Sequence, residues 1–238
     1  MGTSITAALE LLLQEGLKDG DSAVARSALA RRSVRYGFAA GLPTAQDIAQ
    51  ILAAGLAAPS SKNAQPWCFH VVTCGASLDR MANVMKEQDG LADYVPVDPI
   101  TGKPHERFVS TVVESAEVLK EVPLAFFIEN RGEFSNGRHA LVDATPQNLQ
   151  LAIVGYGLEM LGLGGAIQNM WLTAIDLGLS GVFMGDVLIA EEFIREELGM
   201  GGDLVGVLAL GRTDVSEDGP REHSAINLAG RFVDHPGG

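Results

Sequence analysis

Cysteine and histidine are scarce in this sequence, and their placement argues against disulfides and metal sites. The two cysteines, Cys68 and Cys74, flank a segment rich in aromatic and β-branched residues. If this segment is a strand, its six residues span about 20 Å, which is far beyond the reach of a disulfide. The cysteine spacing fits neither a zinc-binding pair nor a redox pair, so we expect both to be small buried hydrophobic residues. The five histidines are scattered without ligand spacing, and we expect His70 to be a satisfied core or interface residue.

The common nucleotide-binding and hydrolase motifs are also missing. The sequence has no G-x-x-x-x-G-K-[ST] and no G-x-S-x-G, which argues against a P-loop and a nucleophile elbow. The glycine clusters at 162–165 and 199–202 do not satisfy G-x-G-x-x-G. A Rossmann dinucleotide site is therefore not expected.

Positive charge is in short supply. The chain has 17 Lys and Arg against 30 Asp and Glu, which gives a net charge of −13 at pH 7. A protein that neutralises phosphate backbones should be basic, and an anionic membrane surface would repel this chain. We therefore expect no nucleic-acid partner and no membrane partner.

The sequence also has no pattern typical of a signal peptide or a membrane span. Residues 1–17 lack a basic start and include Glu10 and Glu15. The longest apolar stretches lie between residues 144 and 185 and are interrupted by Glu159 and Asp176. We expect a soluble, cytoplasmic protein.

Helical and strand patterns alternate along the chain, which is 238 residues long and 47% hydrophobic. Helical periodicity is found near 4–17, 22–32, 44–58, 78–87, 108–119 and 189–198, and short apolar strands are expected at 67–73, 122–128, 179–184 and 204–210. Thr44 followed by Asp47 is typical of a capped helix start. This alternation predicts an α/β or α+β fold, with a single domain over residues 1–238.

The stretch from Pro146 to Leu177 is a long helical pattern that is apolar on every face. Its only charged residues are Glu159 and Asp176. A helix that is apolar all round must be covered all round. We favour a homodimer in which a second chain covers it, and the alternative is a central core helix of a monomer.

A basic island stands out in this acidic chain. Arg26, Arg31, Arg32 and Arg35 fall within ten residues, and no acidic residue occurs from Ser22 to Gln46. Because the planar guanidinium group donates hydrogen bonds in pairs, such a cluster suits a phosphate. The alternative is a solvated helix face that pairs with acidic neighbours.

A loop of hydroxyl and amide side chains, Ala58-Pro59-Ser60-Ser61-Lys62-Asn63-Ala64-Gln65-Pro66-Trp67, joins a predicted helix to a predicted strand. Bounded by prolines, such a loop can hold several donors and acceptors in fixed positions. This suits a flat ligand rich in heteroatoms, such as a flavin ring. An ordinary capped turn is the alternative.

Together, the segment Arg31-Arg32-Ser33-Val34-Arg35 and this loop resemble the N-terminal signature of the FMN-dependent nitroreductase family. Residues 165–170, 174, 177–179 and 185 are similar to the central helix and following strand of that family, and residues 209–212 are similar to its C-terminal segment. The resemblance implies an α+β, three-layer α/β/α fold with a mostly antiparallel sheet. It also implies a homodimer formed by long central helices, with FMN at the interface.

The resemblance also implies the residues that bind FMN. The phosphate and the pyrimidine side of the ring would be held by Arg31, Arg32, Ser33 and Arg35, with Gly211 and Arg212 closing on the phosphate. The partner chain would contribute Pro59, Ser60, Ser61 and Asn63, and Gln65 would contact the ring as well. Met184 and Gly185 would lie beside the ring, with the Gly185 N–H near flavin N5. No side-chain catalyst and no metal are expected.

As a member of this family, the chain would be an NAD(P)H oxidoreductase. A hydride from NADH or NADPH would pass to flavin N5, and a small acceptor such as a nitroaromatic or a quinone would then take the electrons in a ping-pong reaction. Two alternatives remain open. One is a flavin-dependent dehydrogenase or oxidase of a specific metabolite, including relatives that cleave the flavin, and the other is a flavin-binding protein without turnover.

Three segments match no motif of the family. They are an N-terminal extension at 1–21, a turn-rich loop at 89–106 that we expect to cover the flavin, and an extended tail at 212–238. The sequence assigns neither the physiological acceptor nor the preferred nicotinamide.

Overall fold

The computed structural model describes residues 9, 12, 15, 17, 20–98, 101–104 and 109–213. The chain divides into two compact units, Met1–Ala30 with Ser216–Gly238, and Arg31–Val215; a single domain over the whole chain stays a prediction. In the first unit, helix α2 (Ala23–Ala30) begins after Ser22, whose Oγ accepts a hydrogen bond from the Ala25 amide at 3.3 Å. The helix expected at 4–17 is described at residues 9, 12 and 15 alone, and the tail expected after 213 lies outside the described residues.

The second unit is built on a sheet that, within the described residues, has four strands in the order β1-β2-β4-β3. The strands are β1 (Trp67–Val72), β2 (Leu124–Asn130), β3 (Ser180–Met184) and β4 (Asp203–Gly211). Every neighbouring pair is antiparallel. The predicted antiparallel character of the sheet is therefore confirmed.

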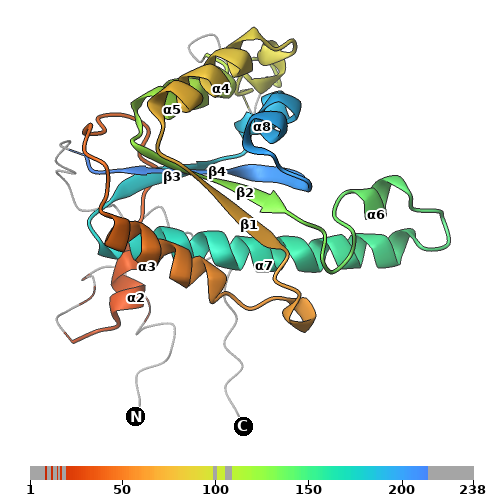
Figure 1. Cartoon of the computed structure of the whole chain (residues 1–238), viewed down its shortest axis with the longest axis horizontal. Helices are drawn as coiled ribbons and strands as arrows, with labels where there is room; N and C mark the ends of the chain where they lie inside the picture. The colour runs from red at the N-terminus through yellow and green to blue at the C-terminus, as the bar shows by residue number, and fades with distance from the viewer. Residues whose placement is uncertain are drawn as a thin grey trace. The chain divides into compact units, whose positions relative to one another are not determined.

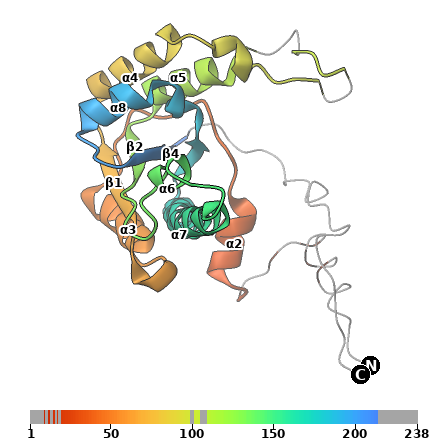
Figure 2. The ribbon, with the colours of Figure 1, turned by 90° about the vertical axis from the view of Figure 1, so that its right-hand side faces the viewer.

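Helices cover both faces of this sheet and make three layers (Figures 1 and 2). Helices α4 (Gly75–Glu87), α5 (Thr111–Glu121) and α8 (Glu191–Leu198) lie on one face, and α3 (Ala45–Leu56) and α7 (Leu149–Asp176) lie on the other. Short helical turns connect them: η1 (Ser61–Asn63), η2 (Leu91–Tyr94), α6 (His139–Val142) and η3 (Asp186–Ala190). Because side chains alternate along a strand, Phe127 packs into the α4–α5 core and Phe126 into the α3–α7 core. The predicted α/β/α layering is confirmed.

Local sequence explains where α3 begins and how closely it packs. Thr44 Oγ1 accepts from the Asp47 amide, and Asp47 Oδ2 accepts from the Thr44 amide, both at 3.1 Å. This is the predicted capping box. A Cβ at Gly55 would lie 2.6 Å from Cγ of Met170 on α7, so a glycine at this position lets the two helices approach.

Helix α7 differs from the prediction in how it is covered. It begins at Leu149 rather than at Pro146, and a single chain does not bury it all round. Its buried residues all lie from Glu159 onward: Glu159, Gly162, Leu163, Ala166, Ile167, Met170, Trp171 and Ala174. In the first half several large apolar residues are exposed, and Leu151 and Leu161 are 75% and 72% exposed. A monomer therefore leaves this half of the apolar helix uncovered.

Within the described residues, α7 is the one helix whose length and composition would allow it to cross a membrane, with a mean hydropathy of 1.3 over its most apolar window. Helices in the core of a folded protein can have the same length and composition. In this chain the second half of α7 packs against α3 and the sheet.

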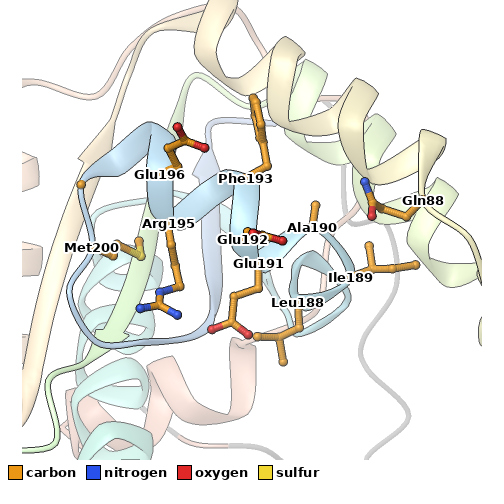
Figure 3. Close-up of a pocket in the computed structure, with 11 residues that line it drawn as sticks. Gln88, Leu188, Ile189, Ala190, Glu191, Glu192, Phe193, Arg195, Glu196 and Met200 are labelled. Carbon is orange, nitrogen blue, oxygen red and sulfur yellow. The ribbon is translucent and has the colours of Figure 1, made fainter.

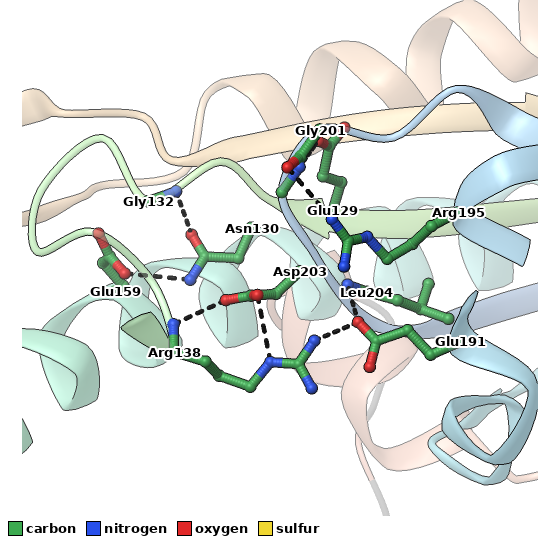
Figure 4. A network of polar contacts seen from close by, with 11 residues as sticks. Glu129, Asn130, Gly132, Arg138, Glu159, Glu191, Arg195, Gly201, Asp203 and Leu204 are labelled. Carbon is green, nitrogen blue, oxygen red and sulfur yellow. Dashed lines mark hydrogen bonds and ion pairs between the residues drawn. The ribbon is translucent and has the colours of Figure 1, made fainter. Parts of the chain in front are cut away.

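A buried carboxylate fixes the long connection between β2 and α7 (Figure 4). Glu159 on α7 is 1% exposed and accepts hydrogen bonds from the Asn130 side chain at 3.0 Å and from the Phe134 and Ser135 amides at 2.9 and 2.6 Å. A Cβ at Gly155 would lie 2.9 Å from Ser135 Cβ, so the connection lies directly on the helix. The connection is therefore held in place by hydrogen bonds to a buried carboxylate.

The same connection is tied to β4 and α8. Arg138 donates from its backbone amide and its Nε to the Asp203 carboxylate at 2.7 and 3.2 Å, and its guanidinium also pairs with Glu191. The Glu191 carboxylate accepts from the Leu204 amide at 3.0 Å as well. Hydrogen bonding by Glu191, despite burial, raises the pKa of Arg138 further above its ordinary value.

Candidate functional site

The predicted anion-binding segment lies along the edge strand β3. Helix α2 ends at Ala30, before the predicted boundary near Arg32. The following residues form a parallel bridge between Ser33 and Gly181, and the Val34 amide donates to the Gly181 carbonyl at 2.9 Å. A Cβ at Gly181 would lie 2.1 Å from the Ala209 carbonyl oxygen, so a side chain there would collide with β4. The Arg31–Arg35 segment thus follows β3 in the same direction.

Two of the predicted phosphate-binding arginines lie at the beginning of β3. The Arg31 guanidinium is 4.5 Å from the centre of the Trp171 ring on α7. Arg212 follows directly after β4, whose last residue, Gly211, is paired with Ser180, the first residue of β3. The Arg212 carbonyl accepts from the Ala39 amide at 2.8 Å, which fixes its backbone beside the segment that follows Arg35.

Arg35 and Gly185 are brought together at the other end of β3 by helix α5. Arg35 Nε is 3.4 Å from Glu114 Oε2. The next residue of α5, Ser115, donates from Oγ to Asp186 Oδ2 at 2.8 Å. Since Asp186 follows Gly185 in the chain, neighbouring residues of one helix hold both groups. Gly185 is exposed, and a Cβ there would meet no atom within 4 Å.

Met184 is placed differently from its neighbour. Its side chain is 3% exposed and packs in the core under α4 and α5. The predicted contact of Met184 with a ligand could therefore be made through its backbone alone.

The second predicted group, the loop from Pro59 to Gln65, has a strained and internally bonded backbone. Three of its non-glycine residues adopt positive φ: Lys62 at 50°, Asn63 at 55° and Gln65 at 48°. Such conformations cost energy and gather at ligand sites. The Ser60 hydroxyl accepts from the Gln65 amide at 2.9 Å, and the Gln65 side chain donates to Asn63 Oδ1 at 3.1 Å.

Within one chain, these two groups contact different parts of α7. A Cβ at Gly162 would lie 3.4 Å from Ser60 Cβ, whereas Arg31 stacks on Trp171. At 1.5 Å per residue, these two helix positions are roughly 13 Å apart. That the loop serves the site of a second chain stays a prediction.

Sequence spacing missed a cluster on β1 and β2. His70 Nε2 lies 2.7 Å from Glu129 Oε2, so the prediction of a satisfied histidine is confirmed. Burial opposes the charged form of Glu129, but hydrogen bonds from His70 and the Gly202 amide hold its pKa below the ordinary 4.5. Burial, together with the Glu129 charge, raises the pKa of the Cys68 thiol. Both cysteines are free. The expectation that both are buried is wrong, because Cys68 is only half-buried and Cys74 is exposed where β1 gives way to α4.

A groove of about 1060 Å³ lies elsewhere, along η3 and α8 (Figure 3). Leu188, Ile189, Phe193 and Met200 line it together with the acidic residues Glu191, Glu192 and Glu196. It contains none of the residues that the sequence assigned to a ligand, so it does not define the candidate site.

Comparison with known proteins identifies the class of this chain. The profile of the Nitroreductase family matches residues 28–212, and the chain belongs to this family. A comparison with curated protein sequences finds no match.

Solved structures with the same fold carry flavin-related names. A BluB-like flavoprotein from Clostridium difficile 630 aligns with a TM-score of 0.65 and 23% identity, covering 91% of this chain and 100% of its own. A nitroreductase with bound FMN from Desulfitobacterium hafniense DCB-2 aligns with a TM-score of 0.58 and 17% identity, covering 83% and 92%. The NADPH:FMN oxidoreductase from Vibrio harveyi, complexed with NAD+, aligns with a TM-score of 0.56 and 22% identity, covering 81% and 70%.

Proposed function

We propose that this protein is an FMN-dependent oxidoreductase that takes electrons from NADH or NADPH and passes them to a small acceptor, such as a nitroaromatic or a quinone. The observation that carries the proposal is the arrangement of arginines along β3. Arg31 and Arg212 lie at its beginning, and α5 holds Arg35 and Gly185 at its end. Membership of the Nitroreductase family and the FMN-related names of proteins with this fold support it.

The residues present fit an elongated ligand with a phosphate at one end and a ring at the other. The five residues of β3 span about 13 Å between their first and last Cα atoms. Arg31, Arg32, Ser33 and Arg212, with the backbone of Gly211, would hold the phosphate by paired hydrogen bonds. The Trp171 indole N–H beneath Arg31 is buried and has no hydrogen-bond partner within the described residues. The beginning of β3 therefore brings together three arginines and this N–H donor, which suits the binding of a phosphate.

At the other end of β3, the chain offers a bare backbone and a cation. Bound FMN supplies a flavin that accepts a hydride and then passes electrons to an acceptor. Because a Cβ at Gly185 would point into open space, its N–H can be approached closely by a flat ring. Arg35 would stabilise negative charge on the pyrimidine side of that ring. In the structure, the ion pair with Glu114 orients the Arg35 guanidinium.

We further propose that the working unit is a cytoplasmic homodimer. The exposed apolar half of α7 would be covered by the same helix of the partner chain, because the interfaces of obligate homodimers are as apolar as the interior of a domain. The strained loop of one chain, with Pro59, Ser60, Ser61, Asn63 and Gln65, would then reach the ring held by the other.

The test is an absorbance spectrum of the purified protein, followed by anaerobic addition of NADH and NADPH. We expect a flavin spectrum that one or both nicotinamides bleach, and an acceptor that restores it. A protein that binds FMN but is bleached by neither nicotinamide contradicts the proposal. In that case, oxygen uptake with metabolites and analysis of the flavin product would separate an oxidase or a flavin-cleaving enzyme from a protein without turnover.

The arginine assignment has its own test. Arg35→Ala should weaken FMN binding by roughly 10-fold to 100-fold, because hydrogen bonds to charged groups contribute about 1.5–3 kcal/mol. Arg80→Ala is the matched control, because Arg80 is also a partly exposed arginine that pairs with a glutamate, Glu197, but lies on α4. Equal FMN dissociation constants for the two variants would remove Arg35 from the site.

A further inference from the structure

Three side chains with metal-binding atoms converge at the edge of the sheet opposite β3. Cys68 and His70 are two residues apart on β1 and so point to the same face. Cys68 is paired directly with Glu129 on β2. The cysteine sulfur, a histidine ring nitrogen and a carboxylate oxygen all lie within 4.8 Å of one another.

We propose that Cys68, His70 and Glu129 bind a single Zn²⁺ ion. Thiolate, imidazole and carboxylate are the three kinds of ligand that zinc takes in proteins, and three protein ligands leave a fourth tetrahedral position for water. The sulfur ligand disfavours Mg²⁺ and Ca²⁺, which take oxygen. No element of the proposed flavin function is needed for this site.

The geometry requires small side-chain movements. With zinc bonds of about 2.3 Å to sulfur and 2.0–2.1 Å to nitrogen and oxygen, tetrahedral ligand atoms lie roughly 3.3–3.6 Å apart. His70 Nε2 and Glu129 Oε2, now hydrogen-bonded at 2.7 Å, would separate by about half an ångström to admit the ion. The His70 side chain is 18% exposed, which leaves the ion a path from solvent.

The carboxylate is already oriented for such a role. Glu129 Oε1 accepts from the Gly202 amide at 2.6 Å, so Oε2 is the oxygen that faces His70. A Cβ at Gly202 would lie 2.1 Å from the Asn130 carbonyl oxygen, so the backbone that donates this bond lies against β2. Partners of this kind fix the orientation of metal ligands in known sites.

The charges at the cluster balance when the ion is bound. A thiolate and a carboxylate bring two negative charges against the two positive charges of zinc. Two guanidinium groups lie nearby, and both make bonds outside the cluster. Arg131 pairs with Glu133 at 2.8 Å, and Arg195 donates to the Gly201 carbonyl at 3.3 Å (Figure 4).

A bound ion would tie the edge strand β1 to β2 close to the strained loop. Cys68 is three residues after Gln65, the last residue of that loop. The first and last strands of the sheet are three strand spacings apart, or roughly 14 Å, so this site is separate from the one along β3. The ion would act as a staple rather than as part of the electron-transfer site.

Cobalt and zinc binding by the purified full-length protein test the proposal. After removal of metal by a chelator, Co²⁺ should produce a thiolate-to-metal absorption band and the intense visible bands of tetrahedral cobalt, read as a difference against the same protein before addition. Cys68→Ser should abolish the thiolate band. Cys74→Ser is the matched control, because Cys74 is the other free thiol and lies outside the cluster; it should leave the spectrum unchanged.

Zinc affinity, measured by competition with a chromophoric chelator, should correspond to one ion per chain. Loss of a neighbour that orients a ligand typically weakens metal binding 10-fold to 100-fold. We therefore expect Cys68→Ser and His70→Gln to weaken zinc binding at least about 100-fold. A Cys68→Ser protein that keeps the wild-type affinity, or binding lost in Cys74→Ser instead, would overturn the site.

X-ray absorption of the zinc-loaded wild-type protein gives a result that depends on no variant. One sulfur at about 2.3 Å with nitrogen and oxygen at about 2.0–2.1 Å supports the three-residue site. A shell without sulfur contradicts it.

Discussion

Replacement of the buried carboxylate Glu159 by the amide of the same shape, Glu159→Gln, should destabilise the protein, although only one oxygen atom is exchanged for an NH₂ group. In the native chain Glu159 accepts three hydrogen bonds, one from the Asn130 side chain and two from backbone amides. A glutamine has one oxygen and one donor group in the same space. If its oxygen serves the two amides, its NH₂ faces the NH₂ of Asn130.

Turning Asn130 over does not restore the pairing. Asn130 Oδ1 accepts from the Gly132 amide at 3.0 Å, and a reversed side chain would present a donor to that donor. At least one hydrogen bond to a charged acceptor is therefore lost, which is worth about 1.5–3 kcal/mol. An uncharged amide is easier to bury, which offsets part of this. We expect Glu159→Gln to lower the free energy of unfolding by about 2 kcal/mol, and Glu159→Leu, which abandons all three donors, by about 3–5 kcal/mol.

The measurement is urea unfolding followed by circular dichroism, at fixed concentrations of protein and FMN because ligand and partner chain both shift apparent stability. Glu133→Gln is the matched control. It makes the same chemical change nearby in sequence, but the Glu133 side chain is 44% exposed and pairs with Arg131 on the surface. Such pairs contribute about 0–1 kcal/mol. Equal unfolding midpoints for Glu159→Gln and Glu133→Gln would refute the view that this buried carboxylate holds the β2–α7 connection in place.

Two further predictions concern α7. Leu161→Glu places a charge on the exposed apolar face of the helix and should convert a dimer into a monomer, as measured by light scattering. The control is Val109→Glu, at a similarly exposed valine before α5, which should leave the mass unchanged. A Leu161→Glu protein that remains a dimer argues against the proposed interface. Burial raises the pKa of Tyr156, although the Arg138 charge opposes this, so in an absorbance titration with alkali Tyr156 should ionise above the ordinary tyrosine pKa of 10.0. In that pH range the unfolded chain loses this proton first, so the free energy of unfolding should fall as pH rises. Tyr156→Phe should remove the component that ionises above the ordinary tyrosine pKa, and a titration that keeps this component in Tyr156→Phe would contradict the assigned burial.

The candidate flavin residues show how far local sequence goes. The Arg31–Arg35 segment and the Pro59–Gln65 loop could be found because each is contiguous, and its residue types alone indicate an anion and a flat polar ligand. The capping box at Thr44 and the alternation of Phe126 and Phe127 between two cores likewise follow from neighbours in the chain. The apolar character of α7 could be read as well, but its uneven coverage could not, because burial depends on what packs against it.

By itself, then, the sequence determined the helices and strands and singled out the two candidate ligand-binding segments, since these depend on periodicity and on residues a few positions apart. The layered arrangement followed from the resemblance to a known family. Tertiary structure alone decided that adjacent residues of α5 hold Arg35 and Asp186, that Glu159 receives a loop from 24 to 29 residues away, and that His70 meets Glu129 across 59 residues. The register of antiparallel strands and the packing of helices set these contacts. Local sequence patterns contain no record of which distant residue a given side chain will face.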